Sequence, residues 1–322
     1  MHILLPNSTF GGKLKEECMK YMEQNEQIPL DYDRLMTRLK ELSDAYRFLD
    51  LHYIGTSILG KAIPAVTFGV GQRAVFYVGA HHGMEWMTSV LLLRYVEDFC
   101  RYYESGALYG KYRVRSIYDT HTITVIPMLN PDGVDYQIHG VEENNPFMER
   151  LKKINPEMVF SYWQANARGV DLNHNYDAGF WEYKRLETEN GIEAGATRYS
   201  GTAPESEPEV AALCNLVRFQ TNLRGILTLH TQGKEICYPS DKTIPNATHA
   251  IARHLSQLSN YRIAFPIGSA AYGGLSDWAN LSCKIPCFTL ECGAGKNPLP
   301  ISDAPLIYAD LKTALLAFPT LL

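Results

Sequence analysis

The sequence predicts a single α/β domain with a mixed, mainly parallel central sheet and helices on both faces. Short β-rich runs alternate with helical segments along most of the chain, and this alternation is typical of a sheet covered by helices. The 322 residues contain no internal repeat and no linker-like stretch. A chain of this length can bury about three quarters of its unfolded surface in one core. We therefore expect a lead segment over residues 1–30 and one domain over residues 31–322.

The helices and strands of this domain can be placed from periodicity. The segment from Tyr32 to Tyr46 puts Leu35, Leu39 and Leu42 three or four residues apart, on one face of an amphipathic helix. Further helices are expected over residues 88–103, 207–219, 247–258 and 305–318. Strand-like runs cover residues 51–60, 61–69, 74–80, 120–129, 224–230 and 285–291. The NPDG sequence that starts at Asn130 predicts a turn.

Composition and charge exclude several classes of partner. The formal net charge is −5, and no run of Lys and Arg carries interleaved aromatic residues, so we expect no nucleic-acid partner. The apolar stretches fall short of the ~20 residues that cross a membrane. The first ten residues lack the features of a secretion signal, and seven cysteines without such a signal favour reduced thiols. These features predict a soluble, cytoplasmic protein, and they leave its oligomeric state unknown.

Polar side chains stand where three of the predicted strands end. His82 and Glu85 follow one strand, His230 ends a second, and Glu291 ends a third. Ligands of open α/β sheets bind beyond the carboxyl ends of the strands. Two imidazoles and one carboxylate form a zinc site that leaves a fourth position for water, so we expect His82, Glu85 and His230 to hold a metal ion. The alternative for His82 is a hydrogen-bonded turn histidine, and a second HxxE at residues 139–142 is attributed to chance.

Seven segments, in order, resemble the zinc carboxypeptidase family. They are GAHHGMEW, LNPDGVDY, ARGVDLNHNYDAGF, YSGTAPESEPE, LHTQGKEICYPSD, GGLSDW and FTLECGAG. The stretches LNHN, HTQGKE and GAGKNPLP are similar to a bacterial branch that includes γ-D-glutamyl-L-diamino acid peptidases of cell-wall peptides. This resemblance implies a zinc carboxypeptidase-like catalytic domain over residues 31–322, one Zn²⁺ ion and metallopeptidase activity.

The resemblance also implies roles for the four strand-end residues. His82, Glu85 and His230 match the family's metal ligands, and Glu291 matches its catalytic glutamate. Zinc can lower the pKa of bound water from 15.7 to about 7. Glu291 can then accept the proton of that water and donate it to the leaving amine. The alternative for Glu291 is a buried carboxylate paired with a lysine such as Lys296.

The loop ARGVDLNHN carries the next three candidates. Arg168 resembles the arginine that polarises the scissile carbonyl, and Asn173 matches an asparagine that helps to hold the substrate's terminal carboxylate. Arg168 could instead be a surface residue, and Asn173 could form an Asx turn. His174 departs from the digestive enzymes, which have arginine there. An imidazole offers at most two divergent donors and titrates near pH 6.5, so carboxylate capture should be weaker or rearranged.

Other polar groups are then needed to hold the end of the substrate. The candidates are Tyr272, Ser276, Glu235 and Lys296. The tyrosine that the digestive enzymes carry before GGxxDW is out of register here, because motif spacing puts its position at Ser269 and Tyr272 immediately precedes Gly273.

The function predicted from these residues is zinc-dependent hydrolysis of an amide bond near the C-terminus of small peptides. The predicted substrates are γ-D-glutamyl-diamino acid peptides, that is, muropeptides derived from peptidoglycan. Three alternatives remain: an ordinary metallocarboxypeptidase, a zinc-dependent deacylase of N-acyl amino acids, and a non-catalytic peptide-binding homologue. The bond that is cleaved and the choice between endopeptidase and carboxypeptidase action stay open.

Overall fold

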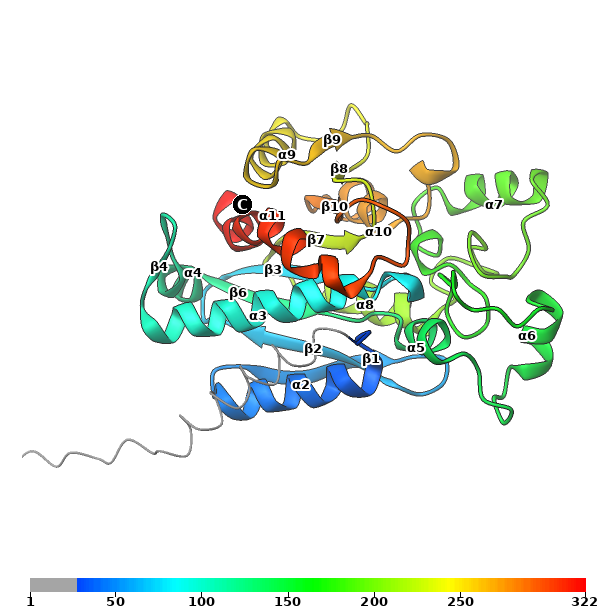
Figure 1. Ribbon diagram of the computed structural model, residues 1–322. Coiled ribbons are helices and arrows are strands. Elements are labelled where there is room, and N and C mark those ends of the chain that lie inside the picture. The colour runs from blue at the N-terminus through cyan, green and yellow to red at the C-terminus, as the bar shows by residue number, and fades with distance from the viewer. Residues whose placement is uncertain (1–27) are drawn as a thin grey trace, which may run out of the picture.

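The computed structural model describes residues 28–322 and confirms the predicted α/β architecture (Figure 1). Its main sheet has eight strands in the order β1-β2-β6-β3-β7-β10-β8-β9. The strands are β1 (Asp50–Thr56), β2 (Ala62–Phe68), β3 (Arg73–Val78), β6 (His121–Ile126), β7 (Leu223–His230), β8 (Glu235–Cys237), β9 (Arg262–Ala264) and β10 (Cys287–Glu291). Strands β6, β3, β7 and β10 are parallel, whereas β2 and β8 run antiparallel to this central group. The sheet is therefore mixed and mainly parallel.

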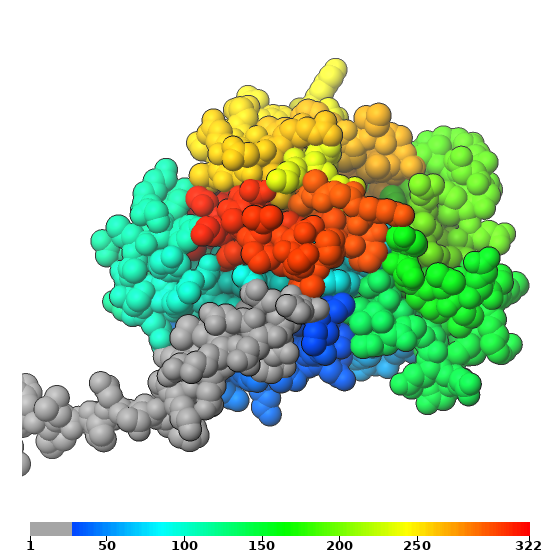
Figure 2. Space-filling model, viewed as in Figure 1, coloured from blue at the N-terminus to red at the C-terminus, as the bar shows by residue number. Residues whose placement is uncertain are grey.

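Helices cover both faces because the central strands are apolar on both sides. In β3, Val75 and Tyr77 join the cluster formed with helices α2, α3, α9 and α11. Ala74 and Phe76 of the same strand point the other way, into the cluster formed with α8 and α10. The helices are α2 (Tyr32–Ala45), α3 (Met87–Ser105), α8 (Pro208–Phe219), α9 (Asn246–Ser259), α10 (Leu275–Asp277) and α11 (Ala304–Ala317). In Figure 2, α11 fills the surface between α3 and α9.

All five predicted helices are present, and the predicted NPDG turn is the start of another helix, α5 (Pro131–His139). Asn130 is its N-cap, where Oδ1 accepts a hydrogen bond from the Gly133 N–H at 2.9 Å. Pro131 occupies the first helical position, where the missing N–H of proline has no cost. The Asn-Pro pair therefore starts a helix here. The prediction of a turn was wrong because the same pair is also common in turns.

The remaining elements are short and carry little periodicity. Strands β8 and β9 have three residues each, too few for an alternating pattern to be visible. The other elements are β4 (Leu108–Tyr109), β5 (Tyr112–Arg113), α4 (Val114–Thr120), α6 (Met148–Ile154) and α7 (Phe180–Glu189). Short helical turns are η1 (Gly83–Glu85), η2 (Leu172–His174), η3 (Gly268–Ala271), η4 (Trp278–Ser282), η5 (Ile301–Asp303) and η6 (Phe318–Leu321).

The predicted lead segment, residues 1–30, lies almost wholly outside the described residues, so the division at residue 30 stays a prediction. Within residues 28–322, no helix combines the length and the apolar character needed to span a bilayer. The six cysteines of the described part of the chain are free thiols, in agreement with the sequence.

Candidate active site

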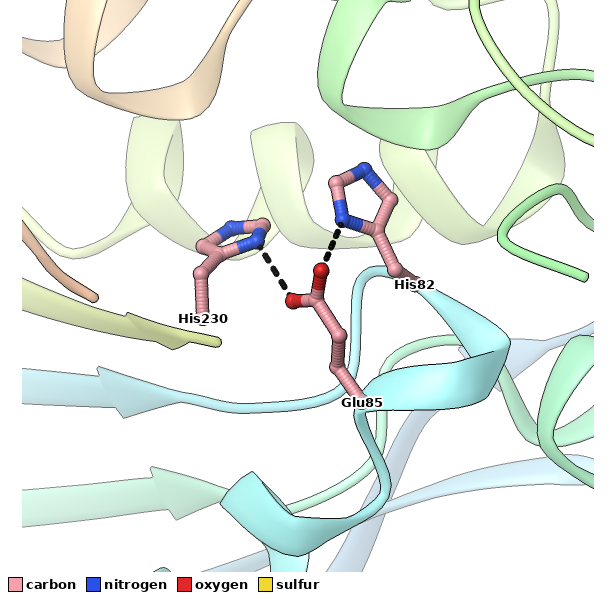
Figure 3. A group of neighbouring side chains, drawn as sticks. All are labelled: His82, Glu85 and His230. Atoms are coloured by element: carbon pink, nitrogen blue, oxygen red, sulfur yellow. Dashed lines mark hydrogen bonds and ion pairs between the residues drawn. The ribbon is translucent and has the colours of Figure 1, made fainter. Parts of the chain in front are cut away.

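The three predicted metal ligands meet at the carboxyl ends of β3 and β7 (Figure 3). His82 precedes η1, Glu85 ends η1, and His230 is the last residue of β7. One oxygen of the Glu85 carboxylate lies 3.0 Å from His82 Nδ1, and the other lies 3.0 Å from His230 Nδ1. Ligand atoms of all three residues lie within 4.8 Å of one another. The structure therefore brings the predicted ligands together around one point.

Close packing against helix α5 sets the path of the chain between these ligands. A Cβ atom at Gly83 would lie 2.2 Å from the Gly133 carbonyl oxygen, so only glycine fits at position 83. The Asn130 side chain donates from Nδ2 to the His81 carbonyl at 3.0 Å. The NPDG segment thus fixes the backbone that presents His82.

Asp171 holds His82 from the side opposite Glu85. His82 Nε2 lies 3.0 Å from Asp171 Oδ1, and the other Asp171 oxygen accepts a hydrogen bond from the Arg198 N–H at 2.9 Å. A carboxylate on the outer nitrogen of a histidine ligand orients the ring. Asp171 is not among the site residues predicted from the sequence, where its pattern is that of a turn-forming residue. Its position two residues before Asn173, in the same motif, is the signal that could have found it.

The electrostatics of this group suit a cation. Burial lowers the pKa of His82, but the charges of Glu85 and Asp171 outweigh burial and raise it well above its ordinary value. Burial likewise opposes ionisation of Glu85, yet the neighbouring His82 and His230 bring its pKa down to about 2. Two imidazole nitrogens beside an ionised carboxylate are a donor set that Zn²⁺ prefers. The residues therefore fit a zinc ion held by His82, Glu85 and His230.

Glu291 lies beside this group without being part of it. It ends β10 and pairs in register with His230 of β7 on one side and with Glu235 of β8 on the other. Burial, followed by the charge of Glu85, raises the pKa of the Glu291 carboxyl to about 8. A group that titrates near neutral pH is suited to exchange protons with a reacting molecule. Lys296, its predicted alternative partner, instead lies 5.0 Å above the Tyr162 ring.

A cavity of about 420 Å³ opens next to Glu291. Three predicted substrate-binding residues, Asn173, His174 and Ser276, line it together with Glu235. Asn173 Oδ1 accepts a hydrogen bond from the Leu275 N–H at 3.2 Å. That contact leaves the Asn173 amide N–H groups to face a ligand. Ser276 Oγ donates to the Cys287 carbonyl at 3.0 Å.

His174 is held as a neutral ring. Its Nδ1 donates to the Tyr272 carbonyl at 3.0 Å, and the imidazole stacks on Tyr183 with ring centroids 4.0 Å apart. Burial lowers its pKa below the ordinary value. Because Nδ1 carries the proton, Nε2 of the neutral ring is an acceptor. At this position the chain therefore presents an acceptor and no fixed positive charge.

Arg168 and Tyr272 do not line the cavity. The Arg168 guanidinium donates from Nε and Nη2 to the two carboxylate oxygens of Glu207, at 2.8 and 2.9 Å. The Tyr272 ring is in contact with Gly179, because a Cβ atom at Gly179 would lie 2.6 Å from Tyr272 Cδ1. Ser269 is exposed in η3. Direct substrate contacts by Arg168 and Tyr272 stay predictions.

Comparisons with known proteins agree with this geometry. Residues 35–308 match the zinc carboxypeptidase family. The chain is 33% identical over 295 residues to γ-D-glutamyl-L-diamino acid endopeptidase 1 of Lysinibacillus sphaericus, covering 91% of this chain and 73% of that protein.

Two solved structures share the fold. Carboxypeptidase A from Helicoverpa armigera superposes with a TM-score of 0.70 at 16% identity and covers 99% of this chain and 82% of its own. Murein-tripeptide amidase from Escherichia coli O157 has a TM-score of 0.50 at 20% identity and covers 83% of this chain and 91% of its own. At these identities the two structures support the fold alone.

Proposed function

The chain belongs to the zinc carboxypeptidase family, and from that premise we propose that it hydrolyses the amide bond between a γ-D-glutamyl group and a diamino acid. As a member of the family it is a metallopeptidase that uses one zinc ion and acts on peptides. The proposed substrates are small muropeptides. The L. sphaericus relative, whose name gives that bond, supports this choice. The predicted cytoplasmic location stays a prediction.

The observation that carries the proposal is the charge of the cavity beside Glu291. None of the residues that line it is a lysine or an arginine, and His174 is neutral there. An ordinary carboxypeptidase must hold a free terminal carboxylate, and a guanidinium does this best because its N–H groups form a planar fork. Without such a group, selection for an ordinary C-terminal carboxylate is weak. The leaving diamino acid of a muropeptide also ends in a carboxylate, so its recognition must rest on further groups of the substrate.

The chain's own residues supply the remaining chemistry. When bound, the zinc ion would supply a nucleophilic water at neutral pH. Glu291 accepts the proton of the attacking water and donates it to the departing amine. Asp171 keeps the His82 ring in the orientation that the metal needs. Asn173 offers amide N–H groups to the substrate, and Arg168 is proposed as the donor to the developing oxyanion.

The test combines metal analysis with a panel of three substrates. Purified protein is expected to contain one zinc ion per chain and to cleave L-Ala-γ-D-Glu-meso-diaminopimelate at the γ-D-glutamyl bond. An ordinary peptide with a free C-terminus and an N-acyl amino acid should be cleaved at least about tenfold more slowly, by kcat/KM. The products are identified by mass spectrometry.

The panel also separates the alternatives. Trimming of the ordinary peptide with the muropeptide untouched would make the protein an ordinary carboxypeptidase and overturn the proposal. Preferred hydrolysis of the N-acyl amino acid would make it a deacylase. Binding of the muropeptide without hydrolysis, with zinc present, would indicate a non-catalytic homologue.

A further inference from the structure

The loop that follows β10 is tied to the metal-ligand group through Asn297. Asn297 Nδ2 donates to the Thr231 carbonyl at 2.8 Å, and Thr231 Oγ1 donates to Asn297 Oδ1 at 2.8 Å. Thr231 directly follows the ligand His230, and its N–H donates to the Glu85 carboxylate at 3.2 Å. Lys296 is the residue before Asn297, so its backbone is held next to the ligand group.

A second loop, between α6 and η2, contacts the ligand group as well. The Gln164 carbonyl accepts a hydrogen bond from the Gly83 N–H at 2.9 Å, and Gly83 directly follows the ligand His82. Trp163 of this loop is fully buried in an apolar cluster and anchors the loop. Tyr162, one residue earlier, is 53% exposed, so its ring is open to solvent beside the ligand group.

Lys296 and Tyr162 bring the two loops together. The Lys296 Nζ lies 5.0 Å from the centroid of the Tyr162 ring, which is the distance of a cation–π contact. Lys296 is exposed, and within residues 28–322 no carboxylate pairs with its ammonium group. Arg168 differs, because both oxygens of Glu207 occupy its guanidinium. Lys296 therefore presents a positive charge that still lacks a counter-charge.

This pair of side chains faces a different part of the substrate from the cavity. The cavity beside Glu291 takes the leaving part, because Asn173, which is predicted to hold the terminal carboxylate, lines it. The acyl part must then extend from the reacting bond away from the cavity. Lys296 and Tyr162 adjoin the ligand group without lining the cavity, so they lie where the acyl part can reach them.

The acyl part of the proposed substrate carries a charge that an ordinary peptide lacks. A γ-D-glutamyl group is linked through its side-chain carboxyl, so its α-carboxylate is free and only a short aliphatic segment separates it from the scissile carbonyl. A residue linked through its α-carboxyl has no free carboxylate in that place. The lysine ammonium has three N–H donors, and the contact with a ring face leaves donors for such a carboxylate.

We propose that Lys296, held against the Tyr162 ring, binds the free α-carboxylate of the γ-D-glutamyl group. This inference rests on the proposed function and names one of the further substrate groups on which recognition depends. It places selection for the γ linkage on the acyl side of the scissile bond. A peptide whose α-carboxylate is converted to a carboxamide loses the ion pair and is a poorer substrate.

The experiment compares two peptides that differ only at this carboxylate. They are L-Ala-γ-D-Glu-meso-diaminopimelate and the same peptide with an α-carboxamide on the glutamyl group. We expect kcat/KM to be about fivefold higher for the free acid, which is the upper range for an exposed ion pair. Lys296→Met should bring this ratio close to one, and Lys296→Arg should keep most of it. Lys40→Met, on the exposed surface of α2, is the matched control and should leave the ratio unchanged.

The ring and the salt concentration give two further readouts of the same contact. Tyr162→Ala should lower the acid-to-amide ratio, whereas Tyr162→Phe keeps the aromatic face and should preserve it. Added salt screens an exposed ion pair. It should therefore lower the ratio in the wild-type protein and leave it unchanged in Lys296→Met, a difference that a purely structural role of Lys296 would not produce.

Binding without turnover separates this proposal from the proposed function. Calorimetry with the zinc-loaded Glu291→Gln variant should show tighter binding of the free acid than of the amide. An acid-to-amide ratio of kcat/KM near one, or a ratio that Lys296→Met leaves unchanged, would overturn the carboxylate site while the proposed function stands. If neither peptide is cleaved, the proposed function fails and calorimetry decides the site. Tighter binding of the acid that is lost on adding Lys296→Met then supports it, and equal binding refutes it.

Discussion

The metal-ligand group and the cavity beside it are neighbours, yet they are built differently. In the ligand group, the Glu85 carboxylate and both imidazoles satisfy one another at 3.0 Å, and the residues come from the ends of central parallel strands. In the cavity, Asp277 and Glu235 come from α10 and the short strand β8, and each has one partner outside the ligand group, the Gly274 N–H for Asp277 and Arg262 for Glu235. The ligand group is therefore placed by the central strands, whereas the cavity is lined largely by peripheral elements.

The largest effect is expected from Glu291→Gln, a substitution that separates metal binding from proton transfer. Glu291→Gln keeps the shape of the side chain but removes its ability to accept a proton, so kcat should fall by about 10²–10⁴-fold. Zinc content should remain one ion per chain, because Glu291 is outside the ligand group. Wild-type kcat in this variant would refute the proposed base, and loss of zinc would show that the two regions are not independent. Both are measured on the same preparation, by steady-state kinetics and elemental analysis.

Substitution of Arg168 tests whether this residue of the 166–171 loop contributes to catalysis or only to stability. If its guanidinium stabilises the developing oxyanion, Arg168→Gln should lower kcat about a hundredfold with little change in KM. Thermal unfolding is followed in parallel, because the same side chain holds Glu207. A lower melting temperature with unchanged kcat would make Arg168 an anchor of Glu207 and nothing more. Arg185→Gln, on the exposed surface of α7, is the matched control.

A smaller effect is expected when the contact between Asp171 and His82 is weakened. Asp171→Asn preserves the size of the side chain but weakens its hold on the imidazole, so zinc affinity should fall about 10–100-fold. Competition with a chelator gives the dissociation constant directly. The control is Asp177→Asn, an exposed residue of the same loop. Unchanged zinc affinity in Asp171→Asn would mean that Glu85 alone orients the ring.

The sequence predicts the ligand group better than the cavity for a physical reason. A buried parallel strand is an apolar run with a clear end, so a polar residue such as His230 or Glu291 at that end is visible in the sequence. The expected helices and central strands are confirmed as well, because their apolar patterns are equally visible in the sequence. The close approach of His82 and Glu85 follows from their spacing at a turn.

The residues that line the cavity could not be predicted from the sequence in that way. Strand β8 is too short to show alternation. Glu235 could therefore be named as a candidate, but the direction of its side chain could not be predicted. Asp277 has the pattern of an ordinary residue in a helical turn, and only the fold shows that it is buried beside open space. Arg168 was matched by motif and Tyr272 was named although it is out of register, but the direction of a loop side chain depends on distant partners such as Glu207 and Gly179.

The double contact of Glu85 has a consequence for the protein before it acquires its metal. The two rings are already drawn toward one carboxylate, so the ligand atoms of the three residues lie within 4.8 Å of one another. Loading with metal is then an exchange in which protons leave as the ion enters. Uptake should consequently acidify an unbuffered solution, and it should require little rearrangement of the chain.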